Sequence, residues 1–192
     1  MIRLGLDASQ RVTSCAVSDD SGIVSVLTMD KPIENFTILI QKTLAQAKIS
    51  ITDIDEIVVC IGPGSQMGVR TTVVTGNALG MALSVPVTGV LSTDALAIAS
   101  PHYEAYLVAV SAGKRRWYVT EYNWNKGKLQ HLDNLKLLDE IPLVESPILR
   151  FDCFDADKAK VCACGILEVV NKQSHLVKQL RLAEVVPYEY GN

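Results

Sequence analysis

A glycine-rich stretch, residues 61–70 with the sequence IGPGSQMGVR, is the part of the chain whose residue types and spacing could do chemistry. It follows an apolar run, residues 57–60, that is typical of a buried strand. A glycine-rich turn between a strand and a helix often holds phosphate, because backbone N–H groups at the helix start point at the anion. Here the glycines are spaced GxGxxxG, whereas dinucleotide sites use GxGxxG after the first strand. The spacing argues against a dinucleotide site.

The residues that follow also argue against a Walker-type phosphate loop. Such a loop needs Gly-Lys-Ser/Thr where the helix opens, and this helix opens with Gly-Val-Arg. We therefore interpret Gly62 and Gly64 as residues that permit a tight turn. Ser65 is predicted to cap the helix by accepting a hydrogen bond from a backbone N–H group.

Metal and thiol chemistry are not indicated by the remaining residue types. The histidines form no HxxxH or HExxH pair, and we expect them on surfaces or loops. The cysteines form no CxxC pair, which favours reduced thiols in a cytosolic protein. These residues are His102, His131 and His175, and Cys15, Cys60, Cys153, Cys162 and Cys164.

Composition restricts the class of protein further. The chain has 192 residues, 48% of them hydrophobic, which is enough for one large domain or for two small ones that share a cleft. Its net charge of −3, with both signs mixed along the chain, gives no overall attraction to nucleic acid or to anionic membranes. The apolar N-terminal run stops at Asp7, and no run reaches the roughly 20 apolar residues of a membrane span. We expect a soluble, cytoplasmic protein without membrane contact.

The first half of the chain reads as three strands followed by alternating helices and strands. Asp, Ser and Gly between the first three strands indicate turns of an antiparallel meander. The order βββαβαβα predicts a mixed sheet with helices on its faces. The expected strands are residues 2–6, 12–17, 23–27, 57–61 and 85–90, and the expected helices follow Pro32, run over 69–84, and start at Ser92 or Thr93.

The second half repeats the start of the first. Strands over 104–111 and 115–124 are joined by Ala-Gly-Lys, and Asn-Lys-Gly turns the chain into a third strand. A helix is predicted around residues 165–180. The chain is thus divided into an N-terminal lobe, residues 1–100, and a smaller C-terminal lobe, residues 101–192, whose tail is expected to return to the first lobe.

The stretch GPGSQMGVRTTVVTGNALGMALSVPVTGVLSTDALA resembles the signature region of the TsaB family, which is involved in threonylcarbamoyladenosine modification of tRNA. The opening LGLDASQRVTSCAV is similar to the first hairpin of that family, and YLVAVSAGKRRWYVTEY to its second. The resemblance implies an α/β fold of the actin and Hsp70 type (ribonuclease H-like), with duplicated βββαβα lobes of which the second is reduced. Its signature-loop residues are Gly62, Pro63, Gly64, Ser65, Gly68 and Arg70.

The resemblance also implies a function. TsaB proteins are non-catalytic paralogues that bind and stabilise TsaD, and they lack the metal-binding histidine pair of TsaD, as this chain does. The implied partners are TsaD as a heterodimer, the ATPase TsaE, and a second copy of the chain when it is alone, with tRNA contacted mainly through the complex. ATP would be used by the complex, with a nucleotide near the subunit junction, and no cofactor is assigned to this chain. In this superfamily two hairpin turns hold ATP, but Asp7-Ala8-Ser9 lacks the glycine and Ser111-Ala112-Gly113 lacks the acid.

Two helices are predicted to carry the partner-binding surface. Projected at about 100° per residue, the second helix has apolar residues on two opposite sides, and small residues recur every fourth position, which would let another helix approach closely. The first helix carries apolar residues on its otherwise polar side as well. The predicted partner-binding residues are Phe36, Ile38, Ile40, Val73, Val74, Gly76, Ala78, Gly80 and Met81.

Other functions stay open on the sequence. A nucleotide-binding ATPase or kinase of the same fold, a metalloprotease, and a homodimeric regulator are the alternatives. The cluster Lys114-Arg115-Arg116 beside Trp117 and Tyr118 is interpreted as a solvated hairpin turn, with an RNA contact as the alternative.

Overall fold

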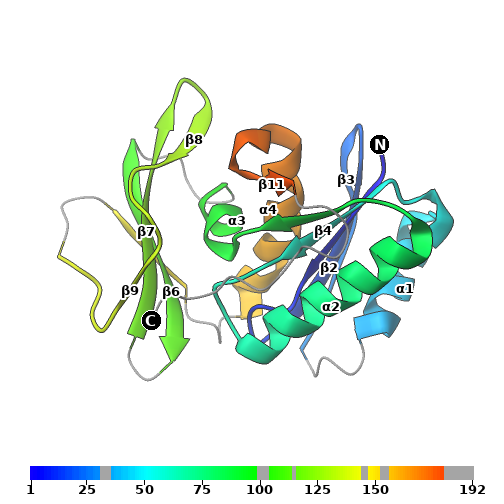
Figure 1. Ribbon diagram of the computed structural model, residues 1–192, viewed down its shortest axis with the longest axis horizontal. Coiled ribbons are helices and arrows are strands. Elements are labelled where there is room, and N and C mark those ends of the chain that lie inside the picture. Colours follow the sequence, from blue (N-terminus) through cyan, green and yellow to red (C-terminus); the bar gives the residue numbers. More distant parts are fainter. Residues whose placement is uncertain (31–35, 99–103, 114–115, 144–146, 152–155, 180–192) are drawn as a thin grey trace.

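Two β-sheets with helices between them and on one outer face form the structure (Figure 1). This computed structural model describes residues 1–30, 36–98, 104–113, 116–143, 147–151 and 156–179. Figure 1 shows the second sheet at the left, α3 and α4 in the middle, and the first sheet with α1 and α2 at the right. The predicted α/β fold class with a reduced second half is confirmed.

The first sheet is built from a meander that parallel strands extend. The antiparallel β1, β2 and β3 are followed by β4 and β5, which run parallel to β1. In the described residues the order is β11-β5-β4-β1-β2-β3. The bounds are β1 Arg3–Asp7, β2 Thr13–Asp19, β3 Gly22–Met29, β4 Glu56–Cys60, β5 Val87–Val90 and β11 Lys178–Gln179.

The second sheet repeats this plan. Its strands β6, β7 and β8 form an antiparallel meander, and β10 lies parallel to β6 as β4 lies parallel to β1. A short strand, β9, pairs with β7 beside β8. The repeated meander predicted from the sequence is thus present. The bounds are β6 Ala105–Gly113, β7 Arg116–Asn125, β8 Lys128–His131, β9 Lys136–Leu138 and β10 Ile148–Phe151.

Helices cover the two faces of the first sheet differently. Helices α1 (Phe36–Ala47) and α2 (Gln66–Leu83) pack on the face that carries Leu4 and Leu6. Helices α3 (Ser92–Ile98) and α4 (Ala156–Lys172) pack on the opposite face, because side chains alternate between faces along a strand. The second sheet lies on the other side of α3 and α4, so these helices separate the two sheets. Two short 3₁₀ helices complete the described elements, Ile51–Asp53 and Ser174–Leu176.

The last helix was placed incorrectly by the sequence, which predicted residues 165–180. Helix α4 begins at Ala156 and ends at Lys172. Gln173 stops it, because its side-chain amide accepts a hydrogen bond from the Leu129 N–H group and donates one to the Gly127 carbonyl. Both residues belong to the second sheet and its turn, so a tertiary contact that the local pattern does not contain ends the helix.

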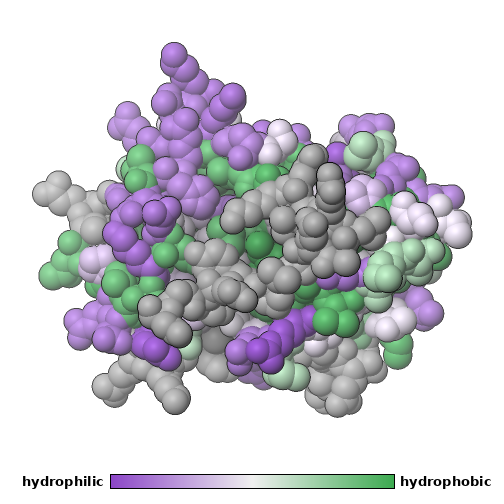
Figure 2. Space-filling view, in the orientation of Figure 1, coloured by the Kyte–Doolittle hydropathy of each residue, from purple (hydrophilic) through white to green (hydrophobic). Residues whose placement is uncertain are grey.

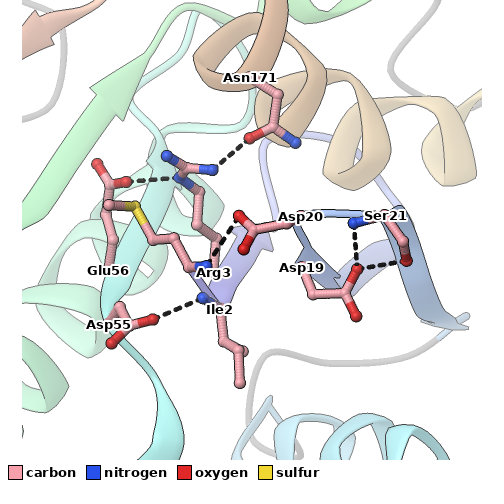
Figure 3. Close-up of polar contacts among 9 residues, drawn as sticks. Ile2, Arg3, Asp19, Asp20, Ser21, Asp55, Glu56 and Asn171 are labelled. Carbon is pink, nitrogen blue, oxygen red and sulfur yellow. Dashed lines mark hydrogen bonds and ion pairs between the residues drawn. The ribbon is translucent and has the colours of Figure 1, made fainter.

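A partly buried ion pair links β1 and β4 at one end of the first sheet (Figure 3). The Arg3 side chain donates to the Glu56 carboxylate over 2.7 Å and to the Asn171 side-chain oxygen of α4 over 2.5 Å. Thr88 of β5 donates to the other Glu56 oxygen over 2.7 Å. Glu56 therefore holds β1, β4 and β5 together, and Arg3 ties them to α4.

We expect Glu56→Gln to lower the free energy of unfolding by about 1–3 kcal/mol, because the Arg3 charge would lose its carboxylate in a nearly buried place. Urea unfolding at neutral pH measures this loss. Asp20→Asn is the matched control, since Asp20 pairs with the amino group of Met1 at an exposed position. Equal stability of the Glu56→Gln variant and the native chain would contradict the role given to this pair.

The packing of α2 on the sheet depends on Gly76. A Cβ atom on Gly76 would lie 2.3 Å from Cγ1 of Val59, a residue of β4. The side of α2 that carries Gly76, which was predicted to meet a partner helix, therefore faces the chain's own sheet. The small residue is needed because β4 already approaches the helix closely.

We expect Gly76→Ala to destabilise the chain by about 1–3 kcal/mol through overpacking, although alanine favours a helix by about 1 kcal/mol over glycine. Thermal or urea unfolding measures the change. The control is Val74→Ala, which lies two positions earlier and is exposed, and which should stay near the native stability. A stabilised Gly76→Ala variant would show that helix propensity outweighs the contact with Val59.

Candidate partner-binding surface

The glycine-rich loop packs against the turn between β1 and β2. A Cβ atom on Gly68 would lie 1.7 Å from the carbonyl oxygen of Ala8, and one on Gly64 would lie 2.2 Å from that of Ser9. The Ser65 N–H group donates to the Ser9 carbonyl over 2.6 Å. These glycines therefore serve the close approach of two backbone segments, and the approaching segment is the chain's own turn instead of a phosphate.

The same loop is fixed from its other side by the start of α3. Ser92 donates its backbone N–H group to the Gly62 carbonyl over 2.8 Å and its hydroxyl to the Pro63 carbonyl over 2.6 Å. The Gly68 N–H group donates to the Ser65 hydroxyl over 3.4 Å, which confirms Ser65 as the N-cap of α2. The loop thus sets the start of α2 relative to β1 and α3.

The β1–β2 turn holds polar atoms without partners. Asp7 is buried, and one of its carboxylate oxygens accepts a hydrogen bond from the Ser9 N–H group over 3.0 Å. The other Asp7 oxygen and the Ser14 hydroxyl have no hydrogen-bond partner in the structure. Asp7 and Ser14 are register partners on β1 and β2, so both side chains point to the face that α4 covers. Among the described residues, no group of three His, Cys, Asp or Glu side chains could hold a metal ion.

An apolar stripe runs along the outer side of α2. Met67, Val74 and Met81 are exposed by 66%, 67% and 65%, and they recur every seventh residue. Residues at this spacing lie on one side of a helix, as at one core position of a coiled coil. Three large apolar side chains exposed in a row are unusual on a helix that otherwise packs on a sheet.

Helix α1 adds to this outer surface. Ile38 is exposed by 45%, and Ala45 is exposed two turns further on. The only charged residues of the two helices are Lys42 on α1 and Arg70 on α2, both exposed, and neither helix contains Asp or Glu. Figure 2 shows green and pale residues among purple ones over α2 at the right, whereas the tip formed by β7 and β8 is purple throughout. We call Ile38, Ala45, Met67, Arg70, Val74, Ala78 and Met81 the α1–α2 outer surface.

The structure corrects part of the predicted partner-binding set. Of the nine residues, Ile38, Val74, Ala78 and Met81 are exposed. The other five face inward, because they fill the core between the helices and the first sheet, where no partner can reach them. The buried residues are Phe36, Ile40, Val73, Gly76 and Gly80.

Other sequence-predicted residues lie apart from this surface. Lys114 and Arg115 of the basic cluster lie outside the described residues, and Arg116 is exposed at the start of β7. The Arg150 guanidinium of β10 lies 4.9 Å from the centre of the Trp117 ring, on the second sheet. Burial raises the pKa of the Cys15 thiol to about 12, against a hydrogen bond with Thr43 that lowers it, so this cysteine is an inert core residue.

His131 was expected on the surface or in a loop, and it is exposed, but it also makes a contact that the sequence did not predict. It is the last residue of β8, and its Nε2 atom lies 2.9 Å from the buried Asp94 carboxylate of α3. His175 lies on the 3₁₀ helix after α4, and His102 lies outside the described residues. The contact of His131 joins residues 37 positions apart, which no local spacing could reveal.

No helix in the described part of the chain is long and apolar enough to span a membrane.

The chain is similar to two groups of named proteins. A tRNA N6-adenosine threonylcarbamoyltransferase of Geotalea uraniireducens is 32% identical over 105 residues, which cover 52% of this chain and 31% of that protein. The tRNA threonylcarbamoyladenosine biosynthesis protein TsaB of Bacillus subtilis is 25% identical over 152 residues, which cover 76% of this chain and 66% of that protein. The chain thus spans less than half the length of the first relative.

A solved structure has the same fold over nearly the whole chain. YeaZ from Pseudomonas aeruginosa superposes with a TM-score of 0.82 at 18% identity and covers 98% of this chain and 99% of its own. The family model described as TsaD: tRNA N6-adenosine threonylcarbamoyltransferase matches residues 9–146, more than half of the chain. The chain therefore belongs to this family, of which it is a TsaB-like member.

Proposed function

We propose that this chain is a non-catalytic subunit that binds and stabilises TsaD in the formation of threonylcarbamoyladenosine at position 37 of tRNA in the cytoplasm. The observation that carries the proposal is the apolar stripe of Met67, Val74 and Met81 on a helix whose opposite side is already buried. The naming of the B. subtilis relative as a TsaB protein of this pathway supports it. In the same proposal the ATPase TsaE joins the complex, and tRNA is contacted mainly through TsaD.

The charges of the α1–α2 outer surface support a partner of a particular kind. Arg70 is its only charged residue, and Lys42, the only charged residue of α1, is exposed one turn after Ile38, so a partner helix that carries carboxylates beside apolar residues would match this surface. Arg70 stands at the positive end of the α2 dipole, where a cation is slightly disfavoured, and a partner carboxylate would remove this cost. The signature loop contributes by fixing where α2 begins.

The glycine-rich loop supports a structural role for this chain over catalysis. The Ser65 N–H group and the Gly62 and Pro63 carbonyls are hydrogen-bonded to Ser9 and Ser92 of the chain itself. Gly64 and Gly68 lie against the Ser9 and Ala8 carbonyls, so these glycines act in packing. In this proposal the catalytic groups belong to TsaD.

A double variant tests the interface. We expect Val74→Asp with Met81→Asp to weaken binding to TsaD of the same organism by about 100-fold or more, since two apolar side chains worth roughly 1.5–3 kcal/mol each would be lost. Co-purification on one tag and titration calorimetry measure the affinity. The same variant should reduce tRNA threonylcarbamoylation in a reconstituted reaction.

Leu143→Asp is the matched control, because Leu143 is fully exposed but lies near the second sheet. Both variants should keep the native circular dichroism spectrum. Unchanged binding of the double variant would refute the α1–α2 outer surface as the interface. Activity of TsaD that does not depend on this chain would refute the stabilising role.

Light scattering of the chain alone tests the homodimer, which should also be lost in the double variant.

Nucleotide binding is the second candidate function, favoured by the unpartnered Asp7 oxygen and Ser14 hydroxyl on the β1–β2 turn. Titration of the isolated chain with ATP and Mg²⁺ distinguishes the two. Micromolar binding that is lost in Asp7→Ala would favour this function.

A further inference from the structure

Asp94 is a buried carboxylate at the junction of the two sheets. It lies on α3 and is exposed by only 1%. The Tyr122 hydroxyl of β7 donates to its Oδ1 atom over 2.6 Å, and Nε2 of His131 lies 2.9 Å from the same oxygen. A carboxylate taken out of water needs hydrogen bonds and an opposite charge to remain ionised at low cost.

His131 is the one described group beside Asp94 that can supply a positive charge. Its side chain is exposed by 30%, so it can exchange protons with solvent. The groups that face the pair are Tyr122 of β7, 4.8 Å away between ring centres, and Tyr106 of β6. Burial and the Asp94 charge raise the pKa of Tyr122 well above its ordinary value, and they raise that of Tyr106 to about 12, so both phenols stay neutral.

The nearby ionisable groups Asp133 and His175 have other partners. Asp133, two residues after His131, forms an ion pair with Lys136. His175 lies within hydrogen-bonding distance of the Leu129 carbonyl of β8 and has no carboxylate partner among the described contacts. The charge state of the Asp94 site is therefore set by His131.

This site connects the two halves of the fold. Helix α3 follows β5 of the first sheet directly, whereas Tyr122 and His131 belong to the second sheet. A further hydrogen bond joins the second sheet to α3, because the Tyr106 hydroxyl of β6 donates to the Ala97 carbonyl over 2.9 Å. Side-chain hydrogen bonds from the second sheet thus converge on α3.

We propose that Asp94 and His131 form a proton-sensitive latch that holds the second sheet on α3 firmly when His131 carries its proton and less firmly when it does not. The latch lies on the face of the first sheet opposite α2, so its test does not depend on partner binding.

The sign of the pH dependence follows from the contacts. The hydrogen bond to Asp94 raises the pKa of His131 above 6.5, in spite of burial, which lowers it. A group with a raised folded-state pKa contributes stability that is complete below its unfolded pKa and is lost as the pH rises through the folded pKa. The latch is therefore tight below pH 6.5 and loosens as the pH rises through the folded-state pKa of His131, which lies above 6.5.

The test compares the full chain with His131→Gln, which keeps a neutral hydrogen-bond donor, between pH 6 and pH 8.5. We expect the native chain to melt above the variant at pH 6, and this difference in Tm to shrink by about 2–4 °C at pH 8.5. Amide hydrogen exchange in α3 and β7–β8 should be slower in the native chain than in the variant at pH 6. At pH 8.5 the ratio of the two exchange rates should approach one. Comparing both proteins at each pH cancels the intrinsic pH dependence of exchange.

His175→Gln is the matched control, because this residue contacts the same strand but no carboxylate, and it should leave the pH dependence unchanged. Should His131→Gln fail to fold, the ring resonances of His131 in the native chain give a second test, with titration above 6.5 expected. A pH-independent difference in Tm, or titration of His131 at or below 6.5, would overturn the latch.

Discussion

The contact between α3 and α4 is the constraint on which the layered structure depends. These two helices must cover one face of each sheet at the same time, so their separation fixes how far apart the sheets lie. A Cβ atom on Gly165 of α4 would lie 2.3 Å from the carbonyl oxygen of Ala95 on α3. The helices therefore meet backbone against backbone, and one apolar core extends from Val58 and Cys60 of the first sheet to Tyr106 and Val108 of the second.

On the opposite face of the first sheet, a close helix–strand contact likewise decides which residues of α2 are buried and which are exposed. Helix α2 comes close to β4 at Gly76, which lets Val69 and Val73 fill the core beside it. The large apolar residues of α2 that have no place in that core point outward. An exposed apolar surface thus arises from an ordinary amphipathic helix with one apolar stripe more than its own sheet covers.

Much of the fold could be predicted from the sequence because its signals are local. Alternating apolar runs and turn residues located both meanders. Ser65 was predicted as the cap of α2, although the helix was expected from residue 69 and begins at Gln66. The two apolar sides of α2 were also visible, but helical projection cannot say which side meets the sheet. That choice is made by Val59, a residue of β4 that leaves room only for glycine at position 76. The resemblance to the TsaB family is confirmed by the family match and the B. subtilis relative. Of the nine residues predicted to bind a partner, four lie on the α1–α2 outer surface.

The parts that could not be predicted depend on contacts between distant segments. The end of α4 is set by Gln173, whose amide bonds to the turn and strand around Leu129. The pairing of His131 with Asp94 likewise appears only once the second sheet lies on α3. Neither pair has a sequence spacing that a pattern could recognise, so Gln173 was placed inside the predicted helix 165–180 and His131 was expected only on the surface or in a loop.

The first sheet and its helices combine early and late parts of the chain, which affects the order in which the protein folds. Helix α4 and β11 come late in the described chain, yet α4 covers Ala16 and Val58, and β11 forms the sheet edge beside β5. During synthesis the first hundred residues can form their meander and bury one face under α1 and α2. The other face is covered only in part, by the short α3, until α4 leaves the ribosome more than fifty residues later. The chain therefore completes its fold as one cooperative unit, and its early strands depend on contacts of high sequence separation, which slow folding.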